Sequence, residues 1–186
     1  KENKENEIMS AYEIRKKLKE SKDVSKYIPY NTNILEKIDY NKYFELLKYN
    51  ILLNKDNLKN IHLIDEGLEN RIYSSALKSS TLEELIENIK TKRYTFNKIN
   101  RILINIYTGF TKEMSKKYND INYIRLLGLS EKGKKYLSNI KKEISIKVYN
   151  KFEKNDMLLL ENKVNNLYNL ITDQKINDIK YHTIIK

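Results

Sequence analysis

Cysteine is absent from the sequence, and proline and glycine are scarce, with one proline and four glycines among 186 residues. The lack of cysteine excludes disulfides, thiolate metal sites and a cysteine nucleophile. Because proline and glycine build the turns of β-rich folds, their scarcity favours long helices. No hydrophobic run approaches the roughly 18 residues of a membrane-spanning helix, and no signal peptide opens the chain. We therefore expect a mainly α protein that is soluble and cytoplasmic and has no membrane partner.

Histidine is also rare. The two histidines, His62 and His182, lie far apart and lack the spacing of metal ligands. The carboxylate pairs Glu66/Glu69 and Glu83/Glu84 fall at expected helix starts, where capping and the helix dipole account for acidic residues. We expect no metal site and no catalytic residue in this chain, although a general acid–base pair of carboxylates stays open as an alternative.

The net charge of +11 is concentrated in one part of the chain. Residues 88–154 carry 17 basic and 5 acidic side chains, a net charge of +12, whereas the rest of the chain sums to −1. Residues 88–112 include six basic side chains and no acidic one. Tyrosines and threonines interleave with these cations, a pattern typical of surfaces that bind RNA phosphates. Two alternatives to RNA binding would also explain the charge: the basic stretch is only a solvated turn, or the lysine excess reflects an AT-rich genome.

The positions of capping and apolar residues predict several helices and two strands. The helices are expected over residues 10–21, 39–53, 65–76, 80–89, 95–106, 130–142 and 156–170. Strands over 122–128 and 144–149 flank the basic helix, which indicates a small βαβ unit with a right-handed crossover. A composition shift at residues 31–33 divides the chain into domains 1–30 and 31–186. The expected fold class is mainly α: a helical RNA-binding domain with a small βαβ element near its C-terminus.

A glycine- and lysine-rich stretch at residues 128–135 nearly matches the phosphate-binding loop G-x-x-x-x-G-K-[ST]. Two residues argue against nucleotide binding there. Lys135 replaces the hydroxyl that would hold magnesium, and Glu131 would place a negative charge in the phosphate cradle. The better interpretation is a helix N-terminus whose clustered lysines contact an RNA backbone.

Five stretches, taken in chain order, resemble a known family. They are IMSAYEIRKKLKE (8–20), EGLENRI (66–72), KTKRYT with the Ile and Arg that follow it (90–101), YIRLLGLSEKG (123–133) and LLLENKVNNLYNL (158–170). Together they resemble the tRNA(Met) cytidine acetate ligase family over nearly the whole chain. The resemblance implies a bacterial enzyme that uses ATP, with Mg²⁺, to activate acetate as acetyl-adenylate. It would then acetylate the wobble cytidine of elongator tRNA(Met) to N(4)-acetylcytidine.

The same resemblance implies roles for parts of this chain. Arg15 would contact ATP, with Ser10 nearby. Adenylation in that family takes place in an N-terminal nucleotidyltransferase-like domain with an H-x-G-H motif, which this sequence lacks. The chain also begins without methionine. We therefore expect a fragment of the ligase that is inactive alone, with residues 1–30 ending the catalytic domain and residues 31–186 forming a C-terminal tRNA-binding domain.

The charge pattern and the resemblance together predict a set of RNA contacts. These are Arg71, Lys90, Lys92, Arg93, Tyr94, Lys98, Arg101, Arg125, Lys132 and Lys134. Two alternative functions stay open at this point. One is a sequence-tolerant nucleic-acid-binding helical module without enzymatic activity, and the other is a helical adaptor that binds protein.

Overall fold

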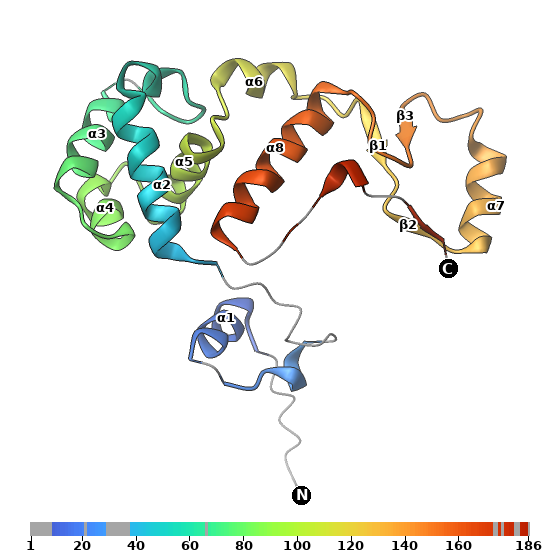
Figure 1. Cartoon of the computed structure of the whole chain (residues 1–186), viewed down its shortest axis with the longest axis horizontal. Helices are drawn as coiled ribbons and strands as arrows, with labels where there is room; N and C mark the ends of the chain where they lie inside the picture. The colour runs from blue at the N-terminus through green and yellow to red at the C-terminus, as the bar shows by residue number, and fades with distance from the viewer. Residues whose placement is uncertain are drawn as a thin grey trace, which may run out of the picture. The chain divides into compact units, whose positions relative to one another are not determined.

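The computed structural model describes residues 9–20, 22–28, 38–65, 67–172, 175, 177–180 and 183–185. The chain divides into two compact units, Lys1–Lys37 and Ile38–Lys186 (Figure 1). The domain boundary predicted at residues 31–33 lies outside the described residues, so the division into 1–30 and 31–186 stays a prediction.

The first unit contains helix α1 (Ala11–Lys19) and the short 3-10 helix η1 (Ser25–Tyr27). Ser10 caps α1 because its hydroxyl accepts the Glu13 amide at 3.3 Å, while the Glu13 carboxylate accepts the Ser10 amide at 3.0 Å. These two hydrogen bonds form a capping box at the start of the helix that the sequence predicts from residue 10. Val24 is fully buried in this unit.

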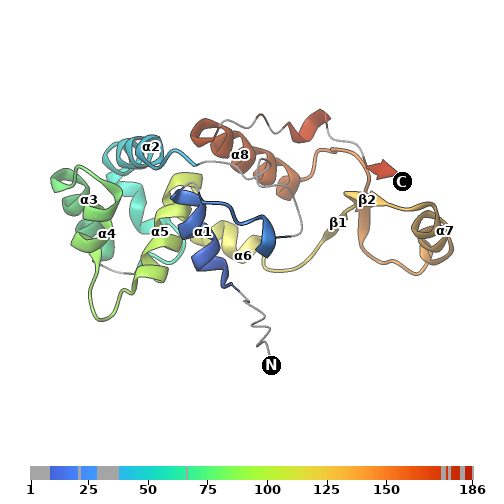
Figure 2. The ribbon, with the colours of Figure 1, turned by 90° about the horizontal axis from the view of Figure 1, so that it is seen from below.

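Five helices of the second unit pack around one hydrophobic core. They are α2 (Tyr40–Leu53), α3 (Leu68–Lys78), α4 (Leu82–Ile89), α5 (Phe96–Thr108) and α8 (Asp156–Ile171). Figures 1 and 2 show α2 to α5 grouped together with α8 alongside α2. The 3-10 helix η3 (Lys55–Asn60) links α2 to α3, and the short helix α6 (Lys112–Lys117) follows α5. The buried stripes sit at the helical spacing that the sequence indicated, for example Ile99, Leu103 and Ile106 on α5.

Two tyrosines join helices of this core. Tyr43 on α2 meets Tyr107 on α5 edge-to-face, with ring centroids 5.1 Å apart. The Tyr107 hydroxyl donates to the Leu167 carbonyl on α8 at 2.8 Å. Burial raises the pKa of both phenols. The folded chain therefore keeps phenolic protons at a pH at which the unfolded chain releases them.

This pKa shift predicts a loss of stability in alkali. The stabilisation that the buried, protonated phenols give to the folded chain is fully present below the ordinary tyrosine pKa of about 10. Above that pH, each further pH unit lowers the free energy of unfolding by up to ~1.4 kcal/mol for each shifted tyrosine. Replacing Tyr43 with phenylalanine removes one such group. As the pH rises above about 10, the free energy of unfolding should therefore fall less in Tyr43→Phe than in the unchanged chain. Urea unfolding at neutral and at alkaline pH measures it. A constant difference between the two chains at all pH values would contradict the prediction.

The segment after α6 forms two small parallel sheets, whereas the sequence predicts a single βαβ unit there. Strand β1 (Tyr123–Arg125) pairs with β3 (Lys147–Tyr149), and helix α7 (Glu131–Ile140) lies between them in sequence. Strand β2 (Gly128–Leu129) pairs instead with β4 (Ile184–Ile185), which follows the short 3-10 helix η4 (Asp178–Lys180).

The single buried strand predicted over residues 122–128 is therefore wrong. Burial alternates along β1, and the chain changes partner after Leu126, whose amide donates to the Tyr149 carbonyl at 2.8 Å. The next carbonyl, that of Leu127, accepts the amide of Ile184 at 3.2 Å. An apolar run has the same sequence pattern whether it pairs with one partner or two, and the C-terminal tail supplies the second partner here. Within the described residues, no helix has the length and hydrophobicity needed to cross a membrane.

Candidate nucleic-acid interface

Three of the predicted cations, Lys90, Lys92 and Arg93, sit on the turn between α4 and α5, residues 90–95, here called the α4–α5 turn. It is closed by two hydrogen bonds between the same residues: the Thr91 amide donates to the Tyr94 carbonyl at 3.3 Å, and the Tyr94 amide donates to the Thr91 hydroxyl at 3.1 Å. The Tyr94 side chain is buried, whereas Lys92 and Arg93 are exposed. The turn is thus anchored by an aromatic ring and presents two cations to solvent.

The ring of Tyr94 is covered by basic groups from its own chain. The Lys98 ammonium lies 4.9 Å from the ring centroid, and the Arg93 guanidinium carbon lies 5.5 Å from it. Cations at these distances are attracted by the ring's electron density. The contacts of Tyr94 are therefore internal, which leaves little of its ring for stacking on a base.

The stretch without acidic residues in the sequence is not free of acid in space. Asp65, in the segment before α3, accepts a hydrogen bond from Lys98 at 3.0 Å and lies 3.7 Å from the Arg93 guanidinium. The hydrogen bond from Lys98, with the charges of Lys98 and Arg93, holds the pKa of Asp65 below its usual value. Asp65 thus remains ionised and neutralises part of this surface. The linear sequence gives no sign of this contact, since Asp65 lies outside the acid-free run of residues 88–112.

The other predicted contacts on these helices differ in their partners. Lys90 forms an exposed ion pair with Glu87 at 2.9 Å, which contributes little in water. Among the described residues, Lys92 and Arg101 form no ion pair and are exposed. We call Lys92, Arg93, Lys98 and Arg101 the basic surface.

Arg71 on α3 points its guanidinium at the end of α4. Its Nε donates to the Ile89 carbonyl at 2.8 Å, and its Nη2 donates to the carbonyls of Asn88 at 3.0 Å and Lys90 at 3.2 Å. The structure thus shows Arg71 bound to backbone, while its predicted contact with RNA stays untested.

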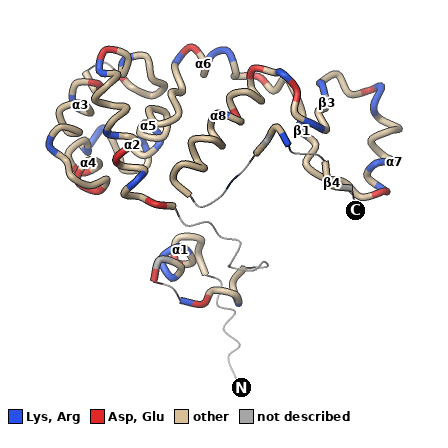
Figure 3. Tube along the Cα trace, viewed as in Figure 1, with Lys and Arg blue, Asp and Glu red and all other residues tan. Residues whose placement is uncertain are grey.

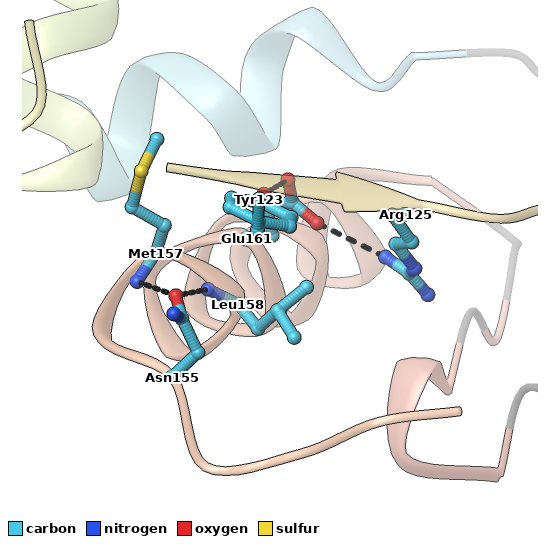
Figure 4. A network of polar contacts seen from close by, with 6 residues as sticks. All are labelled: Tyr123, Arg125, Asn155, Met157, Leu158 and Glu161. Carbon is cyan, nitrogen blue, oxygen red and sulfur yellow. Dashed lines mark hydrogen bonds and ion pairs between the residues drawn. The ribbon is translucent and has the colours of Figure 1, made fainter. Parts of the chain in front are cut away.

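Arg125 is also used within the fold (Figure 4). Its Nη1 donates to Glu161 on α8 at 3.0 Å, and the Tyr123 hydroxyl donates to the other oxygen of the same carboxylate. Burial, together with the hydrogen bond to Glu161, raises the pKa of Tyr123. On the same helix, Asn155 caps α8 by accepting the amides of Met157 and Leu158 at 2.9 and 3.4 Å. Glu161 therefore ties strand β1 to helix α8.

Two further predicted contacts, Lys132 and Lys134, lie on the exposed side of α7. Figure 3 shows basic residues along α7 and around strands β1 and β3. Ser130 caps this helix by accepting the Gly133 amide at 3.1 Å, and Lys134 lies 3.9 Å from Glu131. The helix N-terminus predicted in place of a nucleotide-binding loop is confirmed.

The predicted ATP contacts lie in the first unit. Arg15 is exposed on α1, and the Ser10 hydroxyl donates to the Glu13 carboxylate at 2.7 Å. Their contact with ATP stays a prediction. Groups of three or more potential metal ligands do not occur among the residues that the structure describes.

Comparison with known proteins gives consistent matches. A family model described as HIGH Nucleotidyl Transferase matches residues 1–182. The tRNA(Met) cytidine acetate ligase of Clostridium perfringens is 36% identical over 183 residues, which covers 92% of this chain and 46% of that protein. The ligase of a Geobacillus species is 36% identical over 158 residues, covering 77% of this chain and 39% of the relative. The chain thus spans about half the length of the curated relatives it matches.

Solved structures agree with these relatives. The crystal structure of Thermotoga maritima TmcAL bound with alpha-thio ATP matches with a TM-score of 0.68 and 27% identity, covering 79% of this chain and 42% of that one. The apo structure of the same protein matches with a TM-score of 0.65 and 28% identity, covering 76% of this chain and 39% of that one. The resemblance stated from the sequence motifs is confirmed.

The comparisons overturn two predictions. The chain is not a separate C-terminal helical RNA-binding domain, because the match to a nucleotidyl transferase runs through residues 1–182. For the same reason, the function predicted for it, that of a C-terminal tRNA-binding part, is wrong. Helical spacing and focused charge report on local structure. They do not distinguish a self-contained RNA-binding domain from the helical portion of a nucleotidyl transferase.

Proposed function

The chain belongs to the HIGH nucleotidyl transferase family, and we propose that it forms part of the nucleotidyl transferase of an ATP-dependent tRNA(Met) cytidine acetate ligase. The observation that carries this proposal is the 36% identity with the Clostridium perfringens ligase over 92% of the chain. The ATP analogue in the Thermotoga maritima structure supports ATP as the nucleotide. We further propose acetate and elongator tRNA(Met) as the other substrates, and a cytoplasmic location, because tRNA modification takes place there.

Part of this proposal concerns how the nucleotidyl transferase holds its tRNA. We propose that the basic surface contacts tRNA phosphates, with Lys92, Arg93 and Arg101 as the most accessible cations. Their exposure supports this role, as does the net charge of +12 over residues 88–154. Phosphate contacts of this kind give grip and register rather than base specificity. Lys132 and Lys134 on α7 form a second set of proposed contacts, and Arg15 with Ser10 stays the proposed contact with ATP.

A chimera tests the proposed function. Residues 1–182 of this chain would replace the matching 46% of the Clostridium perfringens ligase, and acetylation of tRNA(Met) from ATP and radiolabelled acetate would be measured. We expect the chimera to acetylate tRNA(Met), and a matched chimera with Arg15→Gln to have weaker apparent affinity for ATP. A chimera that unfolds cooperatively at the temperature of the parent enzyme, yet transfers no acetate, would contradict the proposal.

Asp65 provides a further prediction. Replacing Asp65 with asparagine removes the carboxylate that neutralises Lys98 and Arg93. The two cations then become available to phosphates, so tRNA should bind roughly 5-fold more tightly at low salt, with a steeper salt dependence. Fluorescence anisotropy across a salt series measures both quantities. Asp56→Asn in η3 is the matched control, because it removes an exposed carboxylate outside the basic surface, and equal gains in the two variants would count against this role of Asp65.

A further inference from the structure

We propose that Arg71 is a positioning residue, which holds the α4–α5 turn in the geometry that presents Lys92 and Arg93 to tRNA without contacting the tRNA itself. The inference rests on the proposed contact between the basic surface and tRNA phosphates. It differs from the expectation drawn from charge alone, which treats every exposed arginine of this region as a phosphate contact.

Arg71 binds the backbone carbonyls at the C-terminal end of helix α4. The last carbonyls of an α-helix have no partner within the helix, and they carry the negative end of its dipole. Helix α4 ends at Ile89, and the backbone turns away at Lys90, whose φ and ψ are −56° and 138°. The Arg71 guanidinium binds the three consecutive carbonyls at this end, at 2.8 to 3.2 Å. It therefore caps α4 from a neighbouring helix.

Arginine suits this position better than lysine. A guanidinium is planar and has five N–H donors in a fixed fork, so one side chain can hold several carbonyls at once. Lysine has the same charge on a single nitrogen and cannot reproduce that fork. The backbone that carries the fork is itself held firmly, since the next residue, Ile72, is fully buried in the core.

The capped end of α4 leads directly into the α4–α5 turn. Lys90, whose carbonyl Arg71 binds, is followed directly by Thr91, which closes the turn onto Tyr94 through two hydrogen bonds. Lys92 and Arg93 are the two residues between those closing residues. The backbone position of both cations is thus set on one side by the Arg71 cap and on the other by the buried Tyr94 ring.

Salt dependence separates a positioning residue from a phosphate contact. Each lost phosphate contact makes a plot of log affinity against log salt shallower by roughly 0.7 to 0.9. A displaced turn keeps its charges, and it should weaken binding without this change of slope. The test uses Arg71→Lys, which preserves the charge and removes the fork, beside Lys92→Gln, which removes a proposed contact. Lys78→Gln, on an exposed position of the same helix, is the control for charge loss away from the turn.

We expect Arg71→Lys to weaken binding of tRNA(Met) transcript by about 5-fold at every salt concentration, giving a line parallel to that of the unchanged chain, while Lys92→Gln gives a shallower line. In a Lys92→Gln/Arg93→Gln background, Arg71→Lys should have almost no further effect on affinity, because there is no cation left for it to position. Arg71→Lys should lower thermal stability equally in both backgrounds, and a purely structural role would give the same result. The readout that decides between the two roles is therefore affinity, on which Arg71→Lys should have almost no effect in the double-glutamine background.

Hydrogen exchange keeps this proposal separate from the proposed tRNA contact. The Tyr94 amide donates to Thr91, and its exchange should become faster in Arg71→Lys whether or not tRNA is present. Unchanged Tyr94 exchange, an undiminished effect on affinity in the Lys92→Gln/Arg93→Gln background, or no loss of affinity in a chain that does bind tRNA would each overturn the positioning role. A chain that binds no tRNA, yet shows faster exchange at Tyr94, would contradict the tRNA contact and leave Arg71 with a purely structural role.

Discussion

Replacing Lys92, Arg93 and Arg101 together with glutamine is expected to lower the affinity for tRNA roughly 100-fold at low salt. The three side chains are exposed and belong to the basic surface. If each one neutralises a phosphate, their loss should also reduce the salt slope by about 2 to 3. None of the three is buried, so the unfolding free energy should change by no more than about 0.5 kcal/mol per substitution. Anisotropy titrations over a salt series, with a urea unfolding curve for each protein, measure these effects.

The control for this variant removes the same net charge elsewhere. Lys42, Lys78 and Lys116 are exposed lysines on α2, α3 and α6, outside the basic surface. Their joint replacement with glutamine should weaken tRNA binding only modestly through the overall field of the protein. If both triple variants lost the same affinity and the same salt slope, binding would depend on net charge alone, and the proposed surface would be wrong.

Truncating Leu103 to alanine should destabilise the second unit by about 3 kcal/mol. Leu103 is 1% exposed and lies on the buried face of α5, the helix that carries Lys98 and Arg101. Truncation loses the free energy gained by burying the removed carbon atoms, and it adds the energetic cost of the cavity that they leave. This is a large part of the roughly 5 to 15 kcal/mol that typically separates folded from unfolded domains. The midpoint of urea unfolding should therefore fall markedly.

The neighbouring residue supplies a matched control. Ile104 is on the same helix but 54% exposed, so Ile104→Ala should change stability by about 0.5 kcal/mol or less. A Leu103→Ala variant as stable as Ile104→Ala would mean that α5 does not pack on the core as described.

Local signals in the sequence are enough to predict most helices of the second unit. Asp39 caps α2 and Asn155 caps α8, so these helices begin within a residue of where the pattern places them. The start of α4 is less well predicted: the sequence places it at Ser80, whereas Thr81 is the cap and the Glu84 carboxylate accepts the Ser80 amide at 2.7 Å. Serine and threonine are both good caps, so adjacent candidates differ little in the sequence.

The candidate site shows what a linear pattern omits. Asp65 reaches Lys98 across 33 positions, and Arg71 reaches the end of α4 across 17 to 19 positions. Neither contact has a periodic signal, because each depends on how whole helices pack. Family membership is different again. Five motifs revealed the family, whereas helical spacing and focused charge led to the wrong conclusion that the chain is a separate C-terminal RNA-binding domain.

The most direct test of the tRNA contact proposed here is the anisotropy of this chain with elongator tRNA(Met), another tRNA and a DNA duplex, each across a salt series. We predict binding to tRNA at low salt that weakens steeply as salt rises, with a slope that the Lys92, Arg93 and Arg101 substitutions reduce. Preference for elongator tRNA(Met) would add base recognition to the phosphate contacts. No binding to any of the three at low salt would contradict the account.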